Sequence, residues 1–146
     1  TDTKRAHLDF WNGFKAFMEE SGTPLKLRQP RAQHWYTLAV GRSKFHISLT
    51  SNTQSTQIGC EIYIRGVDAK RAYSLIEQQK ESIESALGEL EWHELPDGQD
   101  CRIKLSRKGN SKSQAQWSEL HGWLKEQSES FYEVFAPIIK SLRYES

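Results

Sequence analysis

Three side chains that could form a hydrolytic triad lie close together in the middle of the chain. His46, Ser48 and Glu61 are a base, a nucleophile and an acid, the groups that serine hydrolases combine. His46 and Ser48 stand two residues apart on one predicted strand, about 6.6–6.8 Å along it. A nucleophile and its base need about 2.6–3.2 Å, and no nucleophile elbow surrounds the serine. A cross-strand ion pair or hydrogen bond on a solvated face is therefore favoured over catalysis.

Nuclease chemistry of the PD-(D/E)xK type is the second candidate. Asp68-Ala69-Lys70 has the D-x-K spacing, and Pro96-Asp97 supplies a literal P-D. The two occur in the reverse order, one at a helix start and the other in a turn, which excludes this site. The sequence also has no HExxH, Walker, GxGxxG or CxxC motif. We therefore expect no catalytic residue, no metal site and no cofactor in this chain.

A basic loop offers a different chemistry. Residues 25–33, LKLRQPRAQ, carry Lys26, Arg28 and Arg31 around Pro30 with no acidic neighbour. Arginine forks match phosphate oxygens bidentately, so this loop could grip phosphate groups. A simply solvated loop is the alternative.

The polar face of the predicted sheet could extend that loop into one contact surface. A sheet face with aromatic and cationic side chains can stack bases or hold an anion, although any uncovered sheet face is polar by necessity. The candidate contacts to a ligand or nucleic acid are Lys26, Arg28, Arg31, His46, Ser48, Glu61, Tyr63, Arg65, Arg102 and Lys104.

Three antiparallel strands within residues 33–65 must position the candidates from His46 to Arg65. Apolar and polar residues alternate there with a period of two, interrupted by Gly-Arg-Ser and by a Ser/Asn/Thr/Gln run. In the first hairpin the alternation predicts the pairs Leu38–Ile47 and Tyr36–Leu49. In the second it predicts Leu49–Ile58 and Ile47–Cys60. On the polar face these pairs give the rows Ala39–His46–Glu61 and Thr37–Ser48–Gly59.

Helical periodicity predicts the rest of the chain. The expected elements are a helix over Thr3–Glu20 capped by Thr3 and stopped at Gly22, a helix over 68–87 capped by Asp68, a hairpin of Glu89–Leu95 and Cys101–Leu105, and a helix over Gln114–Leu142 kinked or split at Pro137. The order α-β-β-β-α-β-β-α predicts an α+β domain with an antiparallel sheet of about five strands and helices mainly on one face.

Length and composition favour one globular domain over residues 1–146. Twenty Lys and Arg against nineteen Asp and Glu give a net charge of +1, which argues against a general polyanion binder but not against a local basic patch. Cys60 and Cys101 fall on apolar positions of predicted strands, as packed thiols of a reducing compartment do. No spanning run or signal peptide is evident, so a cytoplasmic location without membrane contact is expected. Because the chain starts at Thr1, it is either part of a longer protein or has lost its initiator.

Several short motifs together resemble one known family. They are Phe10-Trp11-x-x-Phe14, Gln33-His34-Trp35-Tyr36, Gly41-Arg42-Ser43-x-Phe45-His46-Ile47-Ser48-Leu49, Ile62-Tyr63-Ile64-Arg65-Gly66 and Leu90-Glu91-Trp92. With the aromatic last helix they resemble the bacterial and archaeal domain of unknown function 4268 over nearly the whole chain. The resemblance implies the C-terminal part of a longer bacterial protein whose N-terminal part is nuclease-like. It carries over no catalytic residue.

Three functions follow in order of preference. The first is a non-catalytic binding or accessory module of a nucleic-acid-processing, nuclease or defence-type protein. The second is a protein-interaction or homodimerisation module that uses the long C-terminal helix. The third is a hydrolase acting through the polar sheet face.

Overall fold

A five-stranded antiparallel sheet forms the centre of the protein. The computed structural model describes residues 1–144, and its strands run in the order β1-β2-β3-β5-β4. The prediction of an α+β fold with five antiparallel strands is confirmed. The strands are β1 (Trp35–Ala39), β2 (Phe45–Asn52), β3 (Gln57–Ile64), β4 (Glu91–His93) and β5 (Cys101–Lys108).

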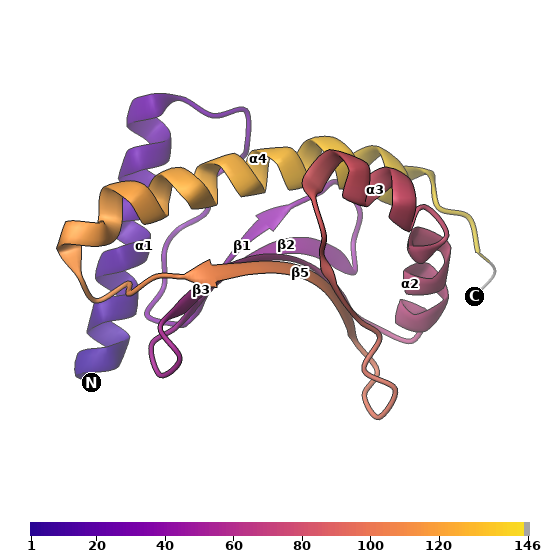
Figure 1. Cartoon of the computed structure of the whole chain (residues 1–146), viewed down its shortest axis with the longest axis horizontal. Coiled ribbons are helices and arrows are strands. Elements are labelled where there is room, and N and C mark those ends of the chain that lie inside the picture. The colour runs from indigo at the N-terminus through magenta and orange to yellow at the C-terminus, as the bar shows by residue number, and fades with distance from the viewer. Residues whose placement is uncertain (145–146) are drawn as a thin grey trace.

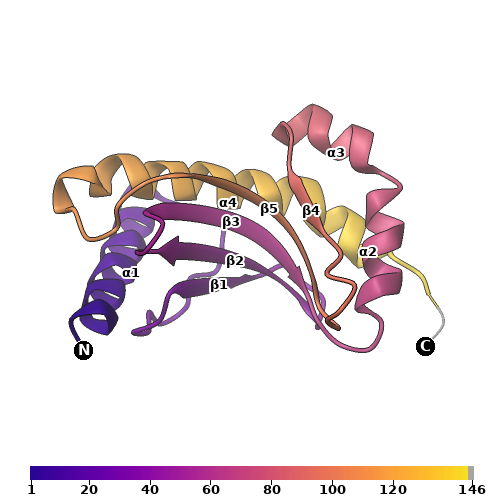
Figure 2. The same ribbon diagram turned by 60° about the horizontal axis from the view of Figure 1, so that its bottom comes forward.

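The helices cover one side of this sheet. The sheet is arched, α4 crosses its convex side, and α1 lies at one end of the arch with α2 and α3 at the other (Figure 1). Turning the molecule shows the concave side, over which no helix of residues 1–144 lies (Figure 2). The helices are α1 (Asp2–Ser21), α2 (Ala69–Glu77), α3 (Lys80–Leu87), the 3-10 turn η1 (Gln114–Gln116) and α4 (Trp117–Ser141).

The period-two alternation decides which side chains the helices cover. Every second strand residue points into the core, where it meets the large aromatic side chains of α1 and α4. Burial of this apolar surface provides most of the favourable free energy of folding. The strand residues are Tyr36, Leu38, Phe45, Ile47, Leu49, Ile58, Cys60, Ile62, Ile64, Cys101 and Ile103, and the helical aromatics are Phe10, Trp11, Phe14, Phe131 and Phe135.

The predicted register is right in one hairpin and wrong in the next. Leu38 pairs with Ile47 and Tyr36 with Leu49, as expected. Leu49, however, pairs with Cys60, two residues from the prediction. The Asn52 side chain accepts hydrogen bonds from the backbone N–H groups of residues 54 and 55, so the turn is centred one residue later than the predicted pairing requires. A shift of two keeps each side chain on its face but changes its cross-strand neighbour.

Helix boundaries differ from the prediction in two places. Thr1, not Thr3, caps α1, because its hydroxyl accepts from the Lys4 N–H at 3.2 Å. The helix predicted over 68–87 is two helices, α2 and α3. The buried stripe of α2 ends at Ile76, and the next position on the same helix face is 80. That position is an exposed lysine, so the chain turns before α3. Asp68 precedes α2, but its side chain makes no capping hydrogen bond.

The last helix is continuous. α4 includes Pro137 and is neither split there nor interrupted before Ser141. Pro137 is exposed, so water can solvate the carbonyl that loses its helical donor. The apolar stripe of α4 packs in the chain's own core, and a homodimer or protein interaction through this helix stays a prediction. The stripe consists of Leu120, Leu124, Phe131, Phe135 and Ile139.

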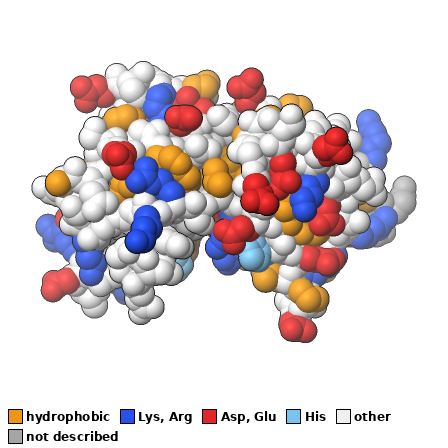
Figure 3. Space-filling view, viewed as in Figure 1, with side chains coloured by type: hydrophobic (Ala, Val, Ile, Leu, Met, Phe, Trp, Pro, Cys, Tyr) orange, Lys and Arg blue, Asp and Glu red, His pale blue; other side chains and the backbone are white. Residues whose placement is uncertain are grey.

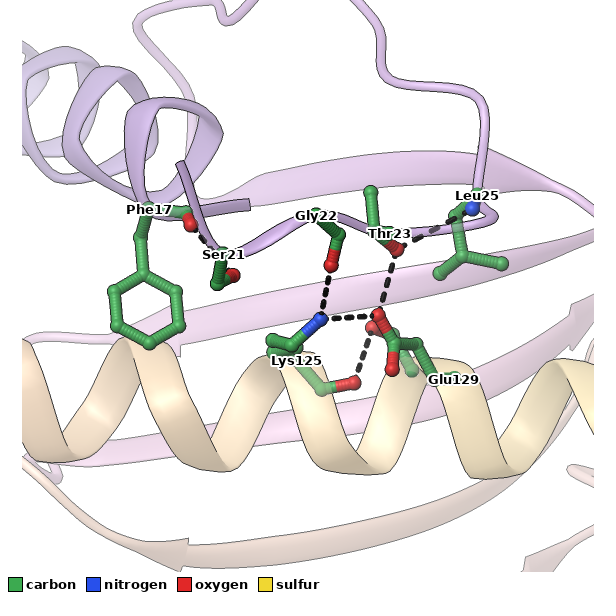
Figure 4. Close-up of polar contacts among 8 residues, drawn as sticks. Phe17, Ser21, Gly22, Thr23, Leu25, Lys125 and Glu129 are labelled. Atoms are coloured by element: carbon green, nitrogen blue, oxygen red, sulfur yellow. Dashed lines mark hydrogen bonds and ion pairs between the residues drawn. The ribbon is translucent and has the colours of Figure 1, made fainter. Parts of the chain in front are cut away.

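The segment between α1 and β1 is tied to the rest of the fold. Figure 4 shows Lys125 of α4 donating to the Gly22 carbonyl and pairing with Glu129, while the Thr23 hydroxyl donates to Glu129 at 2.6 Å. Further along, the indole N–H of Trp11 donates to the Gln33 carbonyl at 2.8 Å. This segment contains the basic loop, so these contacts help to set where its arginines lie.

Candidate functional site

Three rows of side chains cross the open face of the sheet. One row is Thr37, Ser48, Glu61, Lys104 and Glu91. The second is Ala39, His46, Tyr63, Arg102 and His93. The third is Trp35, Thr50, Gly59 and Ser106. The rows place aromatic, cationic and small polar groups on one concave surface.

The second row is a continuous stack of flat groups. The rings of His46 and Tyr63 are stacked with centroids 5.2 Å apart, and the Arg102 guanidinium lies 5.2 Å from the Tyr63 ring. The Tyr63 hydroxyl donates to Asp100 at 2.6 Å, which fixes the ring and raises the pKa of the phenol. Burial, followed by the charges of Arg65 and Arg28, lowers the pKa of His46, which favours the neutral ring.

Glu61 is the buried charge at the centre of the face. Glu61 is only 4% exposed, and burial raises the pKa of its carboxyl. Arg102, Lys104 and His93 act to lower that pKa, but their effect is smaller than that of burial. One carboxylate oxygen lies 3.5 Å from Nε of Arg102. This pair links the partly exposed guanidinium of Arg102 to the buried carboxylate of Glu61.

The face is hollowed into a groove of about 550 Å³. Its floor includes Ser48 and Thr50, and Trp35, at 38% exposure, stands on its wall. Beside Thr50 the chain has Gly59, where a Cβ atom would lie 2.7 Å from the Thr50 hydroxyl. Figure 3 shows the hollow at the lower edge of the molecule, with basic, acidic and histidine side chains around it. His46, Tyr63 and Arg102 of the stacked row are among the residues that line the groove.

A second hollow of about 430 Å³ adjoins the first at His46, which lines both. Its charged lining is entirely basic: Arg28 from the loop, Arg42 and Lys44 from the β1–β2 turn, and Arg65 after β3. Arg42 donates to the carbonyls of Ile139 and Leu142, both at 2.8 Å, and so satisfies backbone acceptors at the end of α4. This cationic hollow therefore brings together basic side chains from three separate segments of the chain.

Most predicted contact residues come together, and two do not. His46, Ser48, Glu61, Tyr63, Arg102 and Lys104 line the groove, and Arg28 and Arg65 line the second hollow. Lys26 and Arg31 are exposed and line neither. The prediction that His46 and Glu61 are cross-strand neighbours is wrong. The shifted turn pairs His46 with Tyr63 and Ser48 with Glu61.

Trp35, Arg42 and Lys44 are among the lining residues that were not predicted as contacts. Trp35 shares the alternation of Thr37 and Ala39, so the strand pattern itself could have placed it on the open face. Arg42 and Lys44 lie in the turn Gly41–Lys44, which the sequence marks only as a break between strands. Their position in a cationic hollow depends on Arg28 and Arg65, which no local pattern brings near.

The same geometry bears on catalysis. Among residues 1–144, no hydrogen bond joins the side chains of His46, Ser48 and Glu61; the histidine stacks on Tyr63 instead. Within those residues there is also no group of three or more His, Cys, Asp or Glu side chains arranged to hold a metal ion. Cys60 and Cys101 are buried free thiols, as predicted, and burial raises the pKa of both. The face is thus arranged for stacking and charge contacts.

One further finding concerns the membrane: no helix in the described part of the chain is long and apolar enough to cross one.

Comparison with known proteins gives one family. The family model described as "Domain of unknown function (DUF4268)" matches residues 6–139, from the first turns of α1 to near the end of α4. The match includes every strand and both hollows. No curated protein and no solved structure matches the chain.

Proposed function

Because this chain belongs to the DUF4268 family, whose description names no activity, we propose a function from the open sheet face: it binds single-stranded nucleic acid. The His46–Tyr63–Arg102 stack carries the proposal. These three groups lie in one row on a concave surface that no helix covers. Bases of a single strand are free to stack on such a row, whereas bases of a duplex are already stacked on each other.

Charge supports the same ligand. Arg102 and Lys104 lie in the groove, and the cationic hollow continues it beyond His46. A strand whose bases face the stacked row would place its phosphates near these cations. Glu61 opposes an anionic ligand, but its raised pKa and its ion pair with Arg102 reduce the negative charge that it presents.

Binding of labelled strands tests the proposal. Fluorescence anisotropy would compare single-stranded DNA, single-stranded RNA and duplex DNA at two salt concentrations. We expect salt-sensitive binding of single strands in preference to duplex. Replacing Trp35 and Tyr63 by alanine should cost about 1–3 kcal/mol of binding free energy for each lost stacking contact. The double charge reversal Arg102→Glu with Lys104→Glu should weaken binding further.

Matched variants separate the groove from general effects. Lys26→Glu with Arg31→Glu makes the same change in net charge at two exposed cations outside both hollows, and it should leave affinity nearly unchanged. Trp123→Ala on α4 removes a tryptophan that does not line the groove. Equal losses in the groove variants and in these controls would refute the assignment of the surface, and no binding even at low salt would refute the function.

We propose in addition that the module binds and leaves chemistry to another domain or protein, such as a nuclease-like partner. The unconnected His46, Ser48 and Glu61 side chains support this division. Incubation of a bound strand with the purified protein should leave it uncut. A cleavage product that disappears in His46→Ala would instead make the third predicted function, an enzyme on this face, the right one.

A further inference from the structure

The cationic hollow has charges that the fold leaves largely uncompensated. Among residues 1–144, Arg28, Lys44 and Arg65 form no ion pair, although other basic residues of the chain do. Asp100 is close enough to act on Arg65, but it already accepts hydrogen bonds from the Tyr63 hydroxyl and the Gly66 N–H. Like charges gathered in one hollow repel each other, so an anion bound there would remove a cost that the free protein carries.

Hydrogen bonds fix the backbone that carries Arg28 and Arg65 and the side chain of Arg42. The phenol of Tyr36, itself 3% exposed, donates to the Arg28 carbonyl at 2.7 Å and accepts from the Arg28 N–H at 2.8 Å. Arg65 is fixed by its N–H, which donates to the Lys44 carbonyl at 2.9 Å. Arg42 is fixed at the end of α4. Fixed backbone positions leave only side-chain freedom to be lost at Arg28 and Arg65 when a ligand binds.

The position of His46 connects this hollow to the groove. His46 is the first flat group of the stacked row and also lines the hollow, so a strand whose terminal base stacks on His46 would have that end next to the cations. An internal phosphodiester carries one negative charge, whereas a phosphate monoester carries about −1.5 to −2 at pH 7. Four basic side chains suit the more highly charged group.

We propose that the hollow lined by Arg28, Arg42, Lys44 and Arg65 is a phosphate-monoester site that takes the phosphorylated end of the strand bound in the groove. This inference rests on the proposed function, because the groove supplies the strand. It adds a preference for strand ends and a fixed direction of the strand across the sheet.

Three otherwise identical short oligothymidylates test the site: one with a 5′ phosphate, one with a 3′ phosphate and one with hydroxyls at both ends. We expect one of the phosphorylated strands to bind at least about tenfold more tightly than the hydroxyl strand, since hydrogen bonds to charged groups contribute about 1.5–3 kcal/mol. Arg28→Gln with Arg65→Gln should abolish this preference while the hydroxyl strand still binds. Both arginines are exposed, and unchanged thermal unfolding would show that the variant folds.

Lys26→Gln with Arg31→Gln is the control, because it removes two charges from exposed positions outside the hollow. The control should keep the preference; loss of the preference in both double variants would reduce the effect to general charge and overturn the site. Equal affinity for all three strands would overturn the site and leave the proposed function standing.

Failure of the hydroxyl strand to bind would refute the proposed function. The phosphate-monoester site would then be tested separately from strand binding. Thymidine monophosphate and thymidine would be titrated while the His46 ring resonances are followed by NMR. A shift with the monophosphate only would support the phosphate site, and no shift would overturn it.

Discussion

At the scale of single residues, Glu61 is a buried acid that also lines the groove of the open face. It stands on the side of the sheet that no helix covers, yet it is 4% exposed. Its neighbours across the strands are Ser48 and Lys104, and its ion-pair partner is Arg102. Burial dominates these attractions, because the pKa of Glu61 is raised and not lowered. The carboxylate therefore positions Arg102 at a cost in stability when it is ionised.

Replacing Glu61 by glutamine should make this cost visible. An acid with a raised folded-state pKa contributes stability that is fully present below its unfolded pKa, about 4.3, and is lost as pH rises through the folded pKa. Glu61→Gln should therefore match the wild type in acid and exceed it in free energy of unfolding above that range. Urea unfolding of both proteins across pH measures the difference. A difference that does not change with pH, or one that favours the wild type at neutral pH, would show that the Arg102 pair outweighs burial.

At the scale of elements, the crossing of α1 over α4 depends on one glycine. A Cβ atom at Gly13 would lie 2.9 Å from Cε1 of His121 and 3.0 Å from Cζ3 of Trp117. Neither ring can move freely. Nε2 of His121 is hydrogen-bonded to the Phe10 carbonyl at 3.0 Å, and the Trp117 indole N–H donates to the Ser111 carbonyl at 2.8 Å. The close approach of the two helices therefore requires hydrogen at this position.

Two glycine-to-alanine substitutions should have opposite signs. Alanine in a helix interior is favoured over glycine by about 1 kcal/mol. At Gly122 of α4 the nearest atom to a new Cβ is Cζ of Phe17 at 3.9 Å, an ordinary contact, so Gly122→Ala should stabilise by about 0.5–1 kcal/mol. Gly13→Ala should destabilise by about 1–3 kcal/mol because it overpacks fixed rings. Urea unfolding compares them, and a stabilised Gly13→Ala would show that the helices can separate without loss.

At the scale of the whole molecule, the sequence predicts what local periodicity controls. Alternation through Phe45, Ile47 and Leu49 is enough to assign strands and faces, because a period of two does not depend on the neighbouring strand. The register of β3 depends on a side-chain hydrogen bond of Asn52 inside the turn, which alternation does not report. The place of the Arg28 backbone depends on two hydrogen bonds to the buried phenol of Tyr36, which alternation does not report either. Sequence therefore predicted the stacked face better than the cationic hollow.

The arrangement of charge over the whole molecule predicts how salt should affect binding. The net charge is only +1, so no strong overall field attracts a polyanion, and affinity must come from cations near the bound strand. The two hollows offer about three to five such contacts, and each contact with a single strand adds about −0.7 to the slope of log K against log salt. We therefore expect a slope of about −2 to −3.5 for the wild type.

Anisotropy titrations over a series of salt concentrations measure that slope. Arg28→Gln with Arg65→Gln should reduce its magnitude by about 1.4 on a strand with a terminal phosphate, because two phosphate contacts are lost. Lys26→Gln with Arg31→Gln should leave it unchanged. A wild-type slope steeper than about −5 would mean that cations outside the two hollows hold the strand. A slope near zero would mean that stacking on the His46–Tyr63–Arg102 row binds bases without contact to their phosphates, so that the groove alone would be the site.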